Sequence, residues 1–168
     1  MITEELRQSL AEYIEQNYVE EIPYQADYSV DGEIEKSSGV TFSKKETFSL
    51  DQLMEEVGES FHDMLFLKID MSGMTDVEVY KRANIDRKLF SKIRSNPAYH
   101  PRKQTVLALA IALKLSLDDT VDLLARAEYA LSPSSKGDLI VKYFIERGVY
   151  DIMAINFALD EYGQPILG

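Results

Sequence analysis

The sequence predicts a mainly α-helical fold, and three observations point to it. Apolar residues recur three and four positions apart through most of the chain. Ser, Thr or Asp stands before several of these runs, where its side chain can cap a helix. Gly or Pro follows where the runs end. The chain has 168 residues, 45% of them hydrophobic, which suffices for one well-packed domain with at most a small appendage.

The first predicted element is an amphipathic helix in the segment TEELRQSLAEYIEQNYVEE, which ends before Pro23. Leu6, Leu10 and Ile14 share its apolar face. Its polar face consists mostly of Glu, whereas helices that lie on membranes carry Lys or Arg there. We therefore expect no membrane contact from this helix.

In residues 24–48 the helical pattern stops. Apolar and polar positions alternate from 24 to 30, Asp31-Gly32 is a turn signal, and residues 36–39 are loop-like. We interpret the segment as a small β-hairpin or an extended crossover that leans on the helices, because it holds too few apolar residues for its own core. An arm that contacts a partner is the alternative. Residues 1–48 are assigned to an N-terminal part made of the helix and this segment.

The next helical run begins at Ser49, which forms a predicted capping box with Gln52. Its apolar face continues to Ile69, and the run ends near Gly73. Gly58 falls inside it, so the pattern fits one bent helix or two in sequence.

The sequence of residues 75–105 predicts two short capped helices joined by a tight turn. Thr75 and Glu78 form a capping box for the first helix, and Asn84 tolerates the left-handed conformation that such a turn needs. Asp86 caps the second helix, which must stop by Asn96, before Pro97. In the second helix the apolar residues Leu89, Phe90 and Ile93 fall three and four positions apart. The following residues point outward: Arg87, Lys88, Ser91, Lys92 and Arg94.

Four helical stretches follow. Residues 102–115 are so apolar that they should be largely buried, and Ser116 with Asp119 caps a helix that reaches Tyr129. Asp118, Asp119 and Asp122 crowd the start of that helix, where capping explains them better than a metal site.

Ser135 with Asp138 caps the next helix, and a last one runs from about residue 151 to 162. These two extra C-terminal helices could close the core or form a dimer surface. We place the domain boundaries at 49–131 for the central helical domain and at 132–168 for a C-terminal extension packed on it.

From about residue 60 to 131 the chain resembles the lambda-repressor-like (XRE-type) helix-turn-helix family. The resemblance rests on the capped pair at 75–95, the Pro-containing loop and the Ala/Leu-rich helix VLALAIALKLSLDD. It implies that the following residues are buried: Val79, Ile85, Phe90, Ile93, Leu107, Ala110 and Leu113. It also implies a DNA-binding transcriptional regulator that places the helix at 86–95 in the major groove, as a two-fold dimer on a pseudo-palindrome.

The distribution of charge is compatible with this function. The chain carries a net charge of -11, yet residues 75–105 hold 8 basic and 3 acidic groups. Phosphate contacts act within about 10 Å, so this local excess governs contact with DNA. Four residues are predicted near base edges or phosphates: Arg87, Lys88, Ser91 and Lys92. Six are predicted to hold the DNA backbone: Lys81, Arg82, Arg94, Asn96, Arg102 and Lys103.

A second hypothesis keeps the fold but assigns it to a non-enzymatic protein–protein interaction or accessory module. Asp76 stands where the family usually has Gln, and Leu89 occupies a commonly polar, outward position. The acidic N-terminal half of the chain also favours this second hypothesis. The region is similar to accessory helix-turn-helix segments of larger, uncharacterised bacterial proteins.

No catalytic motif stands out. The chain has no Cys, which excludes disulfides and thiolate metal sites, and His62 and His100 have no metal-binding spacing. No phosphate-binding glycine fingerprint and no nucleophile elbow occurs. No apolar run could span a bilayer. We therefore expect a cytoplasmic protein that is not an enzyme and has no cofactor or metal.

Overall fold

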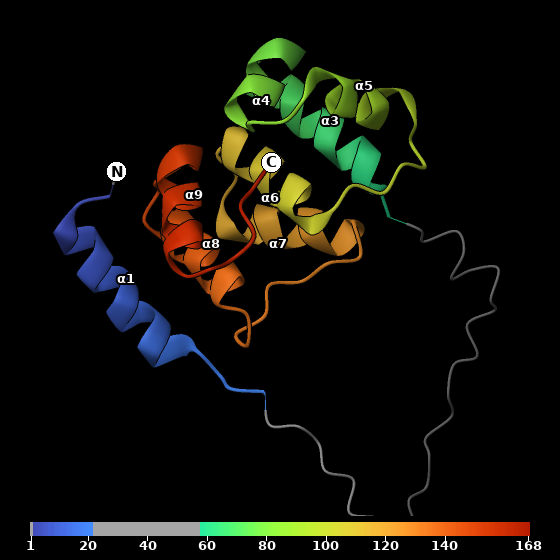
Figure 1. The fold of residues 1–168 in the computed structure, drawn as a ribbon. Coiled ribbons are helices and arrows are strands. Elements are labelled where there is room, and N and C mark those ends of the chain that lie inside the picture. The colour runs from blue at the N-terminus through green and yellow to red at the C-terminus, as the bar shows by residue number, and fades with distance from the viewer. Residues whose placement is uncertain (1, 22–57) are drawn as a thin grey trace, which may run out of the picture. The chain divides into compact units, whose positions relative to one another are not determined.

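The computed structural model describes residues 2–21 and 58–168 (Figure 1). These residues contain helices and no strand, so the mainly α-helical prediction is confirmed for them. The helices are α1 (Glu4–Asn17), α3 (Phe61–Ser72), α4 (Asp76–Arg82), α5 (Arg87–Ser95), α6 (Lys103–Ala112), α7 (Leu117–Arg126), α8 (Lys136–Glu146) and α9 (Ile152–Glu161). None of them is both long enough and apolar enough to cross a membrane.

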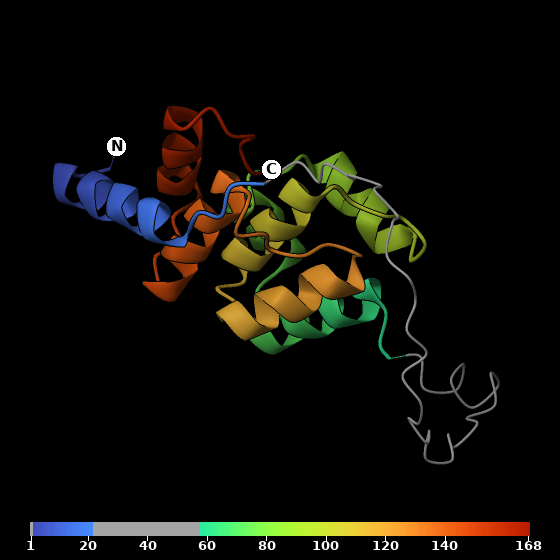
Figure 2. The ribbon, with the colours of Figure 1, turned by 90° about the horizontal axis from the view of Figure 1, so that it is seen from below.

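Helix α6 lies at the centre of this arrangement. Every residue from Thr105 to Ala112 is buried, so the helix is apolar on all sides rather than on one face. It packs against α4, α7 and α9. Figures 1 and 2 both show it between the green α4–α5 pair and the red α9. The position of α4 and α5 is therefore set by a rigid apolar support.

Most helix starts follow the capping residues expected from the sequence. The Thr75 hydroxyl accepts from the amide of Glu78, whose carboxylate accepts in turn from the amide of Thr75 at 2.8 Å. Asp86 and Ser116 cap α5 and α7 as predicted. Helix α3 begins at a capping box that we did not predict, formed by Ser60 and its third neighbour. The predicted hairpin at 24–48 and the predicted capping box at residues 49 and 52 lie outside the described residues.

The turn between α4 and α5 is held by a left-handed residue and an aromatic contact. Asn84 adopts φ 53°, as its place in the turn requires. The Phe90 ring on α5 lies 5.9 Å from the Tyr80 ring on α4 and 6.2 Å from the Phe66 ring on α3. The seven positions expected to be buried are all buried: Val79, Ile85, Phe90, Ile93, Leu107, Ala110 and Leu113.

Two apolar residues of this pair are not fully part of the core. Val77 lies on α4, and its side chain is 46% exposed. Leu89 was assigned an outward position, but it is half-buried against the core. Leu89 is therefore partly covered, which weakens the argument that it is a protein-binding contact.

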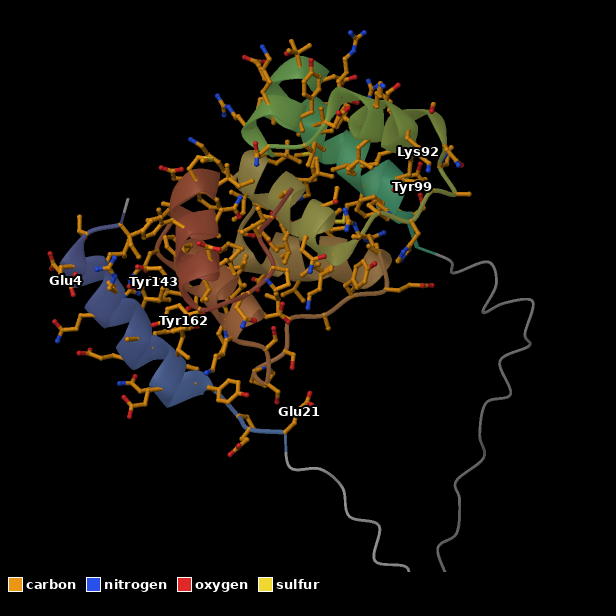
Figure 3. The ribbon with its side chains drawn as sticks, in the orientation of Figure 1. Glu4, Glu21, Lys92, Tyr99, Tyr143 and Tyr162 are labelled. Atoms are coloured by element: carbon orange, nitrogen blue, oxygen red, sulfur yellow. The ribbon has the colours of Figure 1, made fainter. Side chains whose placement is uncertain are left out.

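The N-terminal helix α1 packs on α8. Leu10 and Ile14 are buried, as the amphipathic pattern predicted. The Tyr13 hydroxyl donates to the Glu146 carboxylate at 2.9 Å, and the Tyr13 ring meets Tyr143 edge-on at 5.2 Å. Figure 3 shows Tyr143 facing α1.

This contact should weaken at alkaline pH. Burial, with a smaller contribution from Glu146, raises the pKa of Tyr13 to about 12. Because the unfolded value is about 10, the contribution of Tyr13 to stability is complete below pH 10 and is lost as the pH rises towards 12. In urea unfolding, we expect Tyr13→Phe to lower stability by about 1 kcal/mol at neutral pH, since it removes one hydrogen bond. That deficit should shrink above pH 10, and a deficit that is the same at both pH values would contradict the assignment.

The C-terminal helices close the core, which is one of the two roles that the sequence left open. Tyr143, Phe144 and Ile155 are fully buried. The tail after α9 then returns towards α6 (Figure 1). There the Asn156 side chain donates to the carbonyl of Leu167 at 3.0 Å and accepts from its amide at 2.8 Å.

Candidate nucleic-acid interface

A groove runs between α4 and α5 and has a volume of about 630 Å³. Its apolar residues are Val77, Tyr80 and Phe90. Its polar residues are Asp76, Arg87, Ser91, Arg94 and Ser95. The Tyr80 and Phe90 rings, which contact each other between the two helices, both line it. It brings together three of the ten predicted contact residues.

The outer side of α5 is exposed and basic. Phe90 and Ile93 point into the core, so the residues at the remaining helical positions point outward. Arg87, Lys88 and Lys92 are exposed, and none of them lies within 4.0 Å of a carboxylate in the part of the chain that the structure describes. These cations are therefore available to an external anion.

Lys92 is oriented by an aromatic neighbour. Its ammonium lies 4.4 Å from the centre of the Tyr99 ring, in the loop that follows α5 (Figure 3). Asn96 caps the end of α5, and its side chain accepts from the amide of Ala98 at 3.1 Å. Asn96 and Arg102 are both exposed at the two ends of this loop.

Arg94 differs from the other cations of α5 because it is already paired. Its Nε lies 2.9 Å from the Asp76 carboxylate in an ion pair, and its guanidinium lies 4.5 Å from the centre of the Phe66 ring. The His62 ring lies 3.0 Å from the carbonyl of Arg94 and fixes the end of α5. Arg94 was predicted to hold the DNA backbone, and it would have to do so while it is paired with Asp76.

Lys103 was predicted to hold the DNA backbone, but the structure places it elsewhere. Its ammonium lies 2.6 Å from the Asp138 carboxylate on α8, and that side chain is only 8% exposed. The same carboxylate oxygen accepts from the amide of Ser132 at 2.8 Å. Because this ion pair joins the start of α6 to α8, we leave Lys103 out of the interface.

Lys81 and Arg82 line a second groove, of about 470 Å³, together with Lys114 and residues at the start of α9. They lie at the C-terminal end of α4, whereas the first groove uses its N-terminal end. The eight predicted cations therefore do not form one patch. The part on α5 consists of Arg87, Lys88 and Lys92, and Arg102 lies at the end of the loop that follows α5.

The acidic residues at the start of α7 are engaged in capping and ion pairs. Asp119 accepts from Lys68 at 2.8 Å, and this hydrogen bond, helped by Ser116, lowers the pKa of its carboxyl. Asp122 pairs with Arg126 at 3.3 Å. Within residues 2–21 and 58–168, no three His, Asp or Glu side chains gather as they would around a metal ion.

Comparison with known proteins gives no match to a family model, a curated protein or a solved structure.

Proposed function

We propose that this protein is a DNA-binding transcriptional regulator of the lambda-repressor-like helix-turn-helix type, with α4 and α5 as the two helices of the motif. The observation that carries the proposal is the outer side of α5. Arg87, Lys88, Ser91 and Lys92 are exposed together, opposite the residues that anchor the helix. This arrangement of cations and a hydroxyl around one protruding helix matches what major-groove recognition requires.

The dimensions of α5 support this proposal. An α-helix with its side chains is about 10–12 Å wide, and the major groove is about 12 Å wide. Nine residues extend about 13 Å, enough to present two turns of side chains to base edges. Arg87 and Lys88 lie at the N-terminal end of α5, where such helices usually enter the groove.

The residues around α5 supply contacts to the DNA backbone. Arg102 and Asn96 flank the loop after α5, and Lys92 is held by Tyr99. A single unit of this size contacts too little DNA for high specificity, so we propose that two copies bind the half-sites of a pseudo-palindrome.

A thiol-protection experiment tests whether DNA covers this face. The chain has no Cys, so Ser91→Cys introduces a single thiol on the exposed side of α5. We expect saturating duplex DNA to slow alkylation of this thiol at least about tenfold, because a helix seated in the major groove excludes the reagent. The matched control is Ala11→Cys on the exposed side of α1, whose alkylation rate should not change.

If DNA binds and protects neither thiol, the interface lies elsewhere on the protein. If no duplex binds, the proposal fails.

The apolar floor of the first groove supports a second candidate, a protein-binding module. Val77, Tyr80 and Phe90 could receive an apolar side chain of a partner, with Arg87 and Arg94 at the rim. Recovery of a stoichiometric protein partner, together with DNA binding at background level, would favour this function over the first.

A further inference from the structure

The groove between α4 and α5 contains one carboxylate among its eight lining residues, that of Asp76. An unpaired carboxylate would repel the phosphates of DNA. Here its Oδ2 lies 2.9 Å from Arg94 Nε in an ion pair, which offsets the charge. Asp76 is therefore compatible with a DNA-facing position, although in the sequence it is one of the features that favour the protein-binding hypothesis.

Arg94 holds this carboxylate in a defined orientation. The guanidinium of Arg94 is stacked 4.5 Å from the Phe66 ring, and the Phe66 ring itself packs against Phe90. The backbone at Arg94 is fixed by the contact of its carbonyl with His62 at 3.0 Å. Because these contacts do not involve Asp76, Arg94 remains a fixed positioning group for it.

The second oxygen of Asp76, Oδ1, has no hydrogen-bond partner among the described residues. The side chain is 36% exposed and faces the same groove as Arg87 and Ser91 on α5. The groove thus presents an oriented acceptor beside the side chains proposed to meet base edges.

An ionised carboxylate accepts hydrogen bonds and donates none. In the major groove, cytosine N4 and adenine N6 are donors, whereas guanine O6 and thymine O4 are acceptors that a carboxylate repels. Val77 is the next residue on the same groove wall and is 46% exposed. Its apolar side chain suits the C5 edge beside the amino group of cytosine, which adenine lacks. The acceptor and its apolar neighbour together match cytosine.

We infer that Asp76, positioned by Arg94, reads the N4 amino group of a cytosine at one base pair of the target and so determines specificity. This inference rests on the proposed DNA binding. It adds a base-reading residue on α4 to those on α5.

Selection of bound sequences from a pool of randomised DNA duplexes tests the inference. We expect the wild-type protein to prefer cytosine over thymine about tenfold at one position. Asp76→Ala should abolish the preference at that position alone. Asp76→Asn should move it towards adenine, because an amide can bond to both N6 and N7. Asp70→Asn, which removes an exposed carboxylate from α3, should leave all base preferences unchanged.

The outcomes separate the inference from the function on which it rests. If wild type, Asp76→Ala and Asp76→Asn bind DNA with the same preferences, Asp76 does not read a base, while DNA binding stands. If wild type retains no duplex, both fail. Asp76→Asn preserves the size of the side chain, so it tests whether Asp76 reads a base even if Asp76→Ala does not fold.

Discussion

Replacing Lys103 by Met should destabilise the protein by about 2–3 kcal/mol, because it leaves the buried Asp138 carboxylate without its cation. Breaking a fully buried pair costs more, but the Lys103 side chain is 23% exposed, so water compensates part of the loss. Urea unfolding measures the effect as a lower midpoint with an unchanged slope.

Two further variants identify the cause. Lys103→Met/Asp138→Asn should recover most of the loss, because an amide still accepts from the amide of Ser132 and carries no charge. Lys68→Met breaks a second ion pair, with Asp119, whose side chain is 41% exposed. That variant should lose less than about 1 kcal/mol. Equal losses for the two Lys→Met variants would show that burial of Asp138 is not the reason.

The features of the fold that could be predicted are those encoded within a few residues. Thr75 and Asp86 cap their helices through amides two or three positions away, and Asn84 takes its left-handed conformation because of the turn in which it stands. Ser60 was missed because the apolar run to Ile69 was read as starting from Ser49. Its partner Asp63 is three residues on, so the signal was present in the sequence.

The candidate site was harder to predict because the partners of its charged side chains are distant in sequence. Asp76 and Arg94 meet only because α4 and α5 cross. Lys103 meets Asp138 only because α8 packs against the start of α6. Counting charges along the sequence placed Arg94 and Lys103 in one basic cluster. In the structure each of them pairs with a different carboxylate. The exposed cations of α5 were predictable because Phe90 and Ile93 fix its inward face.

The double variant Arg87→Ala/Lys92→Ala should bind duplex DNA about 100-fold more weakly than wild type, because it removes one contact expected at base edges and one expected at a phosphate. Both side chains are exposed, so their removal should leave the fold intact. Lys136→Ala/Lys142→Ala removes the same charge from α8 and should keep most of the affinity.

The most direct measurement of DNA binding by α5 is a mobility shift of these three proteins at several salt concentrations. Each lost phosphate contact should reduce the slope of log K against log salt concentration by about 0.9. We expect a strong, salt-dependent shift for wild type and the α8 variant, and both a weaker shift and a shallower slope for Arg87→Ala/Lys92→Ala. Unchanged retention of DNA by the α5 variant would contradict this expectation, as would an absence of binding by wild type.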